Sequence, residues 1–326
     1  MALIYTSEMN AITNDYFVLD DGAAFDIFYQ TSWWLNYLLK QRKGYFKLYD
    51  GGEYIRVLLD YDEVEGGFYL RGESISSDHK ETIQAARFAP KHCYGNGTVL
   101  RVDLQAAGGE YGQIDLIKHQ IKKAQQRCTN LAASALYDEY GTSSSRFTGF
   151  GACCDETTSR AYGGFSEDDL ESRDGTKPWE GKRNTTSEQI STPSLRELVR
   201  DTHQSDGPDK EADLVGTERQ LYDSLISQLE AQQRYRSSDE MAKAGFKGVM
   251  IDNFTVFHDD FCPSGWACAI TSKCYGFVIH RDGFFEREKW DKIPNSPGDK
   301  AMKIYLDGNA VATNRRVHKI HTNLTA

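Results

Sequence analysis

The stretch from position 258 to 268, HDDFCPSGWAC, gathers side chains that bind metals or transfer protons. A carboxylate can tune an imidazole for acid–base work, and a thiolate is a nucleophile or a metal ligand. Structural zinc sites, however, usually have cysteines two to four residues apart and a second ligand pair further on, whereas Cys262, Cys268 and Cys274 are each six residues apart. His258 and Asp259, adjacent on a strand, would point to opposite faces. We therefore predict no metal-binding or catalytic residue here, and interpret the stretch as a strand, Phe254 to Phe257, that ends in a turn.

Other motifs that carry chemistry are missing from the sequence. There is no GxxxxGK[ST] phosphate loop, GxGxxG turn, GxSxG elbow or HExxH pair. The glycines at 108, 109 and 112 precede a helix and could cradle an anion, but glycine is ordinary at a helix start. We predict no cofactor and no enzymatic activity. A metal-dependent hydrolase that uses His258, Asp259 and Cys262 is the alternative from a different class.

Composition limits further which class of protein this chain can belong to. The 326 residues carry a formal net charge of −10, which argues against a protein whose main task is to grip a nucleic acid backbone. No apolar run approaches the roughly 18 residues of a membrane span, and the start, MALIYTSEMN, does not read as a signal peptide. We expect a soluble protein made in the cytoplasm, without membrane contact. The seven cysteines, with a vicinal pair at 153 and 154, fit free thiols in a reducing compartment.

The elements that must position these residues begin with an arm, residues 1–20, and an amphipathic helix from Ala23 to Lys40. Extended-favouring runs follow at 45–49, 54–59 and 68–70, separated by glycine pairs, and these predict strands joined by turns. Such a two-stranded excursion is marginal in water and needs another surface to cover it. Positions 82–104 predict a further extended segment with a turn at 94–97.

The strongest periodic signal lies between positions 113 and 140. Apolar residues recur there at intervals of three and four, which predicts one continuous helix of roughly 40 Å: Ile114, Ile117, Ile121, Ala124, Cys128, Leu131 and Ala135. Cys128 lies within this stripe and is expected to be buried. The opposite face is basic, with Lys118, Lys122, Lys123 and Arg127. It is interpreted as a solvated surface, with a partner-binding or DNA-facing strip as the alternative.

The second half of the chain changes character. Positions 155–192 are polar and poor in aliphatic residues, which predicts a long exposed loop. A short helix near Ser194, a strand at 213–215 and a helix opened by a capping box at 217–220 suggest a mixed α/β unit. From Phe246 onward the sequence is strand-like.

This order of elements resembles the major capsid proteins of tailed double-stranded DNA bacteriophages, which have the Hong Kong ninety-seven type fold. Local stretches carry the resemblance from about Asp20 onward: LAASALYDEYGT with FTGFGACC, AYGGFS with KPWEGKRN, EADLVGTERQLYDSLISQLEAQQRY followed by AGFKGVMIDNFTVFHDDFCPSGWACAITSK, and NAVATNRRVHKIH. Each is short, and together they are fairly specific.

The resemblance implies an α+β fold in defined parts. They are an N-terminal arm at 1–20, a helix at 21–43, an extended hairpin loop at 44–75, a peripheral domain at 76–150 with its spine helix at 113–140, an axial domain at 151–299, and C-terminal strands at 300–326 that return toward the peripheral domain. Under this interpretation the opening stretch is a strand-to-turn junction, in which Asp259 or Asp260 and the Pro263-Ser264-Gly265 turn hold the bend.

The implied function is a structural protein of the virion. The chain would be assembled in the host cytoplasm into pentamers and hexamers that close an icosahedral capsid around the DNA genome. Scaffolding, portal and decoration proteins are the further partners. Contact with DNA would be weak and non-specific, and one surface considered for it is the basic cluster Arg315, Arg316, His318, Lys319 and His321. The hairpin offers only Lys47 near its base, so no crosslinking is predicted. A cellular nanocompartment shell is the alternative within the same fold.

Overall fold

The structure is a computed structural model that describes residues 9, 32–39, 45–64, 66–72, 74, 81–107, 110–139, 145–156, 161–172, 175–203, 211–232, 236–237 and 248–326. The predicted arm at 1–20 therefore lies outside the described residues, apart from Met9, which is buried beside Val99 and Leu104. Of the helix predicted at 21–43, the described part is α3, Trp33–Leu39.

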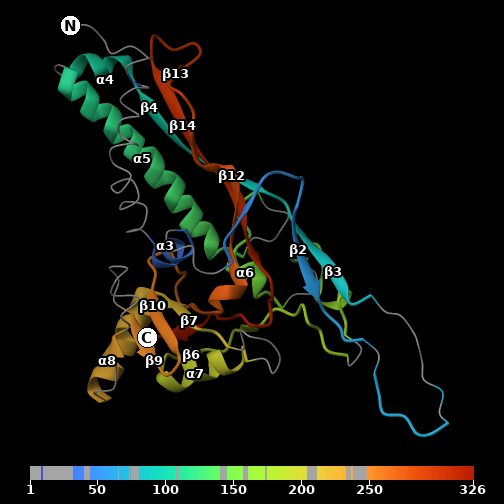
Figure 1. Ribbon diagram of the computed structural model, residues 1–326. Coiled ribbons are helices and arrows are strands. Elements are labelled where there is room, and N and C mark those ends of the chain that lie inside the picture. Colours follow the sequence, from blue (N-terminus) through green and yellow to red (C-terminus); the bar gives the residue numbers. More distant parts are fainter. Residues whose placement is uncertain are drawn as a thin grey trace.

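A five-stranded sheet and the helix α5 (Glu110–Leu136) form the elongated part of the molecule (Figure 1). Two 13-residue strands, β12 (Tyr275–Arg287) and β14 (Lys300–Ala312), pair antiparallel at its centre. They are joined by the remaining strands: β1 (Lys47–Tyr49), β4 (Lys91–Val99) and β13 (Asp291–Lys292). The helix lies along β4 and β14, and Ile117, Ile121 and Ala124 are buried against this sheet with Trp290, Met302 and Ile304.

The helix confirms the periodic signal, with two differences. It ends at Leu136, before the predicted Tyr140, and Leu131 is 37% exposed while its neighbour Ala132 is buried. The stripe therefore shifts by one residue near its end. Cys128 is buried, as expected.

The segment 82–104 is organised differently from the prediction. It forms β3 (Ile83–Phe88), the uninterrupted strand β4 and the short helix α4 (Arg101–Ala106). The turn predicted at 94–97 is wrong, because Gly95 and Gly97 lie within β4. Both glycines face α5, where a Cβ on Gly95 would lie 2.0 Å from the Ala124 carbonyl oxygen. Glycine inside a strand here marks a close approach of two backbones.

A seven-stranded mixed sheet forms the second part, covered by two helices (Figure 1). Its strand order is β5 (Arg183–Asn184), β15 (Lys319–His321), β11 (Ala267–Ile270), β7 (Leu214–Thr217), β10 (Phe254–His258), β9 (Val249–Ile251) and β8 (Arg236–Ser237). Apolar side chains of α7 (Thr192–Arg200) and α8 (Arg219–Gln232) share one cluster with this sheet. A separate two-stranded pair joins β6 (Glu188–Gln189) to β16 (Leu324–Thr325).

The helix α7 begins as its sequence suggests, but α8 does not. Ser191 caps α7 by accepting from the Ser194 amide, with a proline in the first turn. The capping box predicted at 217–220 is wrong, since Thr217 ends strand β7 and its hydroxyl donates to the Phe257 carbonyl.

Two predicted domain boundaries cut across the sheets. Strands β12 and β13 fall within 151–299, yet they pair with β14 in the sheet that carries α5. Strand β15 falls within 300–326, yet it pairs with β11 and β5 in the seven-stranded sheet. Of the last 27 residues, those in β14 therefore belong to the five-stranded sheet, whereas those in β15 belong to the seven-stranded sheet.

Candidate assembly surfaces

The stretch 258–268 forms the predicted strand-to-turn junction. Strand β10 ends at His258, the Cys262 amide donates to the Asp259 carbonyl, and the Trp266 amide donates to the Pro263 carbonyl. Gly265 has φ +76, a left-handed conformation that favours glycine.

The buried Asp259 carboxylate holds α3 in place. Its Oδ2 accepts from the Ser32 hydroxyl at 2.5 Å and from the Trp34 amide at 3.2 Å, and its Oδ1 accepts from the Phe261 amide at 3.0 Å. Burial raises the pKa of this carboxyl, and the donated hydrogen bonds oppose that shift. The carboxylate therefore links the start of α3 to the turn that follows β10.

His258 points elsewhere, against the ring of Tyr222 with centroids 5.1 Å apart. Nowhere in the described ranges does a group of three His, Cys, Asp or Glu side chains form that could hold a metal ion. The residues of the hydrolase alternative are thus not brought together as a ligand set.

The hairpin is the most exposed apolar feature of the molecule. It is built from β2 (Ile55–Asp60) and β3, paired antiparallel with Ile55 opposite Phe88. The predicted partner strand at 68–70 is wrong, because residues 66–70 form no strand, and β1 pairs with β12 instead. Figure 1 shows the two strands, with residues 66–72 beyond them, projecting away from both sheets.

The two faces of β2 differ. Ile55, Val57 and Leu59 are buried, whereas Leu58 on the opposite face is 76% exposed. Beyond the strand, Val64, Phe68, Tyr69 and Leu70 are each at least 68% exposed. We call these five exposed side chains, Leu58, Val64, Phe68, Tyr69 and Leu70, the apolar ribbon. Nothing in the described part of the chain covers it.

The base of the hairpin rests on the polar segment that follows position 155. The Arg87 amide donates to the Gly163 carbonyl at 2.7 Å, and Phe88 packs edge-on against Tyr162 with centroids 5.1 Å apart. A Cβ on Gly163 would lie 2.9 Å from Ala86 and from Phe88. Tyr162 and its neighbours therefore support the hairpin directly.

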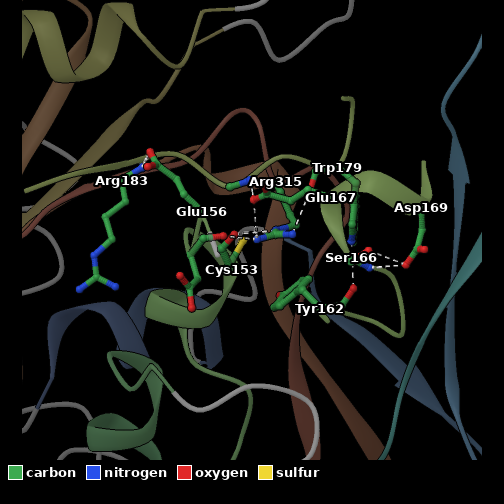
Figure 2. Close-up of polar contacts among 11 residues, drawn as sticks. Cys153, Glu156, Tyr162, Ser166, Glu167, Asp169, Trp179, Arg183 and Arg315 are labelled. Atoms are coloured by element: carbon green, nitrogen blue, oxygen red, sulfur yellow. Dashed lines mark hydrogen bonds and ion pairs between the residues drawn. The ribbon is translucent and has the colours of Figure 1, made fainter. Parts of the chain in front are cut away.

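Arg315 organises that segment from within (Figure 2). Its guanidinium donates to the carbonyls of Cys153, Trp179 and Asp155 at 2.7, 2.9 and 2.8 Å, and Glu167 lies 3.9 Å away. The Trp179 indole in turn donates to the Tyr162 carbonyl at 2.9 Å. Burial raises the pKa of Glu167, against the pull of the Gly181 amide and Arg315. The segment predicted as an exposed loop is thus irregular but packed around one arginine.

The DNA contact considered at positions 315–321 is wrong for three of its five members, because Arg315, His318 and His321 are each at most 3% exposed. Arg316 and Lys319 are partly buried, and Lys319 pairs with Asp201 at 2.6 Å. One sequence signal for this burial was missed. Tyr162 and Trp179 are large aromatic residues in an otherwise polar segment, and their presence indicates that the segment packs against a buried cluster.

An exposed basic surface lies instead on α5. Lys118, Lys122, Lys123 and Arg127 are all exposed, and Arg127 lines a groove beside β4 together with Cys93. We call them the basic stripe. In the part of the chain that the structure describes, no salt bridge involves any of the four.

No family model and no curated protein matches the sequence. Several solved structures, however, are similar to the structure of this chain. The capsid of cyanophage A-1(L) is 12% identical with a TM-score of 0.65, covering 86% of this chain and 90% of that chain. The capsid of cyanophage P-SCSP1u is 8% identical with a TM-score of 0.56, covering 88% of each. The SrpI encapsulin of Synechococcus elongatus is 8% identical with a TM-score of 0.52, covering 88% of this chain and 86% of that chain.

These likenesses show the fold. The chain has the α+β Hong Kong ninety-seven type fold of phage capsids, which confirms the fold class and the structural resemblance inferred from the sequence. None of the helices in the described ranges is both long and apolar enough to cross a bilayer.

Proposed function

We propose that this chain is a major capsid protein that assembles into pentamers and hexamers and closes an icosahedral shell around a phage genome. The observation that carries the proposal is the apolar ribbon on a chain with this fold: Phe68 is fully exposed, and Leu58, Val64 and Leu70 are at least 76% exposed. Burying one such side chain contributes about 1.5–3 kcal/mol. Apolar patches of this kind mark interaction sites, and an identical subunit supplies a cover at every position of a closed shell.

Negative-stain microscopy of the purified protein tests the proposal. We expect rings, sheets or shells of uniform diameter. Leu58→Asp and Phe68→Asp should abolish these assemblies, because a buried unpaired carboxylate would cost several kcal/mol at each contact, whereas Leu58→Met and Phe68→Leu should still assemble. Small dispersed particles under every assembly condition, with or without scaffolding, portal or decoration proteins, would contradict the proposal.

The shell would enclose double-stranded DNA in the virion, and we assign the inner contact to the basic stripe. The chain carries a net charge of −10 and should repel phosphates over most of its surface. The basic stripe is the exception: its four cations lie within ten residues of α5, as two pairs spaced four residues apart on the exposed half of the helix. Contacts of this kind go to the phosphate backbone and carry no sequence information.

Salt dependence tests this assignment. The unassembled protein should bind a labelled DNA duplex weakly, with an affinity that falls steeply as salt rises. The combined Lys118→Gln, Lys122→Gln and Lys123→Gln variant should flatten the log–log slope by about three, one for each lost phosphate contact. The matched control neutralises Arg219, Lys289 and Lys292, which are also exposed. An equal loss in the control would show that only total charge matters, and intact assembly of both variants by microscopy keeps the shell proposal separate.

A nanocompartment shell is the second candidate, because the fold is shared with an encapsulin. The two candidates differ in what the shell holds. Nuclease-protected DNA inside shells recovered from the native source supports the capsid, and an enclosed enzyme without DNA supports the compartment. We assign no catalytic step to the chain in either case.

A further inference from the structure

Two cysteines that are far apart in sequence meet between β4 and α5. The Cys93 and Cys128 sulfurs are 3.7 Å apart, and the Cys128 thiol donates to the Cys93 sulfur. All seven cysteines of the chain are free thiols in the structure.

The sequence explains why these two sulfurs touch. Cys93, Gly95 and Gly97 alternate along β4 and so face the same side, toward α5. Gln120, Ala124 and Cys128 are four residues apart and so share one face of the helix. A Cβ on Gly95 would meet Ala124, and one on Gly97 would meet the Gln120 carbonyl at 3.2 Å. Cys93 and Cys128 are the next pair along this close-packed seam.

Only one of the two thiols can be reached from solvent. Cys93 is partly exposed and lines a groove of about 440 Å³ with Arg127 and Arg146, while Cys128 is fully buried beneath it. The hydrogen bond from Cys128 lowers the pKa of Cys93, and the Arg127 guanidinium lowers it further, whereas burial and Asp307 oppose these effects. The same hydrogen bond and burial raise the pKa of Cys128. Of the two sulfurs, the accessible one therefore ionises more readily.

We propose that Cys93 and Cys128 form an oxidation site, in which a peroxide converts the pair into a disulfide between β4 and α5. The Cys93 thiolate attacks hydrogen peroxide, breaks its O–O bond, and becomes a sulfenic acid with release of hydroxide. The Cys128 thiol then attacks the Cys93 sulfur, forms the S–S bond and expels the oxygen, which leaves as water after taking up the thiol proton. The two thiols lose two electrons and the peroxide gains them.

The disulfide would close a loop that includes α4 and the first two thirds of α5, and so would restrict the unfolded chain. The sulfurs must approach by about 1.6 Å to reach bonding distance, a movement within reach of side-chain rotation at two contacting residues. In a reducing cytoplasm the thiols persist, and after release into an oxidising medium the bond forms. The site lies within one subunit, so it does not depend on the proposed shell.

Mass spectrometry of the full-length protein tests the proposal. After brief treatment with hydrogen peroxide and quenching with catalase, the intact mass should fall by about 2 Da through loss of two hydrogens. A non-reducing tryptic map should then show the peptide His92–Arg101 joined to the peptide Cys128–Arg146. The thermal unfolding midpoint should rise by a few degrees on oxidation and return with a reductant.

Variants separate this pair from the other thiols. Cys93→Ser and Cys128→Ser should each lose both the mass change and the rise in midpoint, and Cys274→Ser should keep both. Because Cys93 lies at the surface, its serine variant should fold even if Cys128→Ser does not. A cross-link that maps to Cys153 and Cys154 or to Cys262 and Cys268 would overturn the proposal, as would oxidation of Cys93 beyond the sulfenic acid without any link.

Discussion

At the scale of single residues, strand β15 carries Lys319 and His321 into the seven-stranded sheet, between β5 and β11. His258, Asp259 and the nearby cysteines could be judged from spacing alone, and the structure confirms a turn there. The burial of the basic cluster at 315–321 could not be predicted from residue spacing. Five basic or histidine side chains within seven positions look like a surface, and only the long-range pairing of β15 with β5 and β11 turns them inward. Pairings of that kind leave no local pattern in the sequence.

Arg315 gives a stability prediction at this scale. Arg315→Lys should lower the free energy of unfolding by about 3 kcal/mol, because one ammonium cannot reach the three carbonyls that the planar guanidinium satisfies, and a buried acceptor left alone costs about 1–3 kcal/mol. Denaturant titration measures the change. The control Arg219→Lys, at an exposed site, should shift it by less than about 0.5 kcal/mol. Equal stability of the two variants would mean that water replaces the lost donors.

His318 gives a prediction about pH. Burial lowers its pKa to about 3, and its Nδ1 accepts from the Thr271 amide, so the folded protein holds the ring neutral. In the unfolded chain the pKa is about 6.5. Between these values the unfolded state binds more protons, so stability contributed by this ring is complete above about pH 6.5 and is lost as pH falls toward 3.

We therefore expect His318→Gln to flatten the pH dependence. Between pH 7 and 5 the wild-type protein should lose about 2 kcal/mol more unfolding free energy than the variant does. Chemical denaturation at a series of pH values measures this difference. The control His119→Gln, at an exposed helix position, should retain the wild-type slope. A variant with an unchanged slope would place the acid sensitivity in other groups.

At the scale of elements, periodicity predicted what depends on neighbours in sequence and missed what depends on neighbours in space. The stripe on α5 appeared in the pattern because one helix face is buried along most of its length. The strand that pairs with β2 was not predicted, because 22 residues separate the end of β2 from the start of β3 and an apolar run at 68–70 looked equally suitable. The glycines of β4 suggested a turn, because the sequence of the strand alone does not show that α5 packs closely against it.

Those glycines give the prediction for this scale. Gly95→Ala should be among the most destabilising single-methyl additions in the chain, since its Cβ would lie 2.0 Å from the Ala124 carbonyl oxygen, a backbone atom that no side-chain rotation can move away. We expect a loss of about 3 kcal/mol or a visible displacement of α5. Gly67→Ala is the matched control, with no atom within 4 Å of the new Cβ, and should be neutral. Thermal unfolding of the two variants compares them directly, and equal midpoints would show that the seam between β4 and α5 is loose.

At the scale of the whole molecule, the elements are divided between two packed regions and one projection. Both sheets share buried apolar clusters with helices, as a self-sufficient domain does. The hairpin buries one face at its base and leaves the apolar ribbon in water. A chain that folds alone gains nothing from such a projection, whereas one that assembles can place it on an identical neighbour.

Hydrogen exchange distinguishes these cases. In dilute, unassembled protein we expect the backbone amides of residues 66–69, which form no strand in the structure, to exchange within seconds, and those of β4 and β14 to stay protected. On assembly the same hairpin amides should slow by at least about tenfold, because a neighbour excludes water from them. The assembly-defective Leu58→Asp variant provides the control, since its β4 and β14 amides should be protected as in the wild type while its hairpin stays open. Firm protection of residues 66–69 in a stable monomer would mean that the chain itself covers the ribbon, and assembly through this surface would then have no driving force.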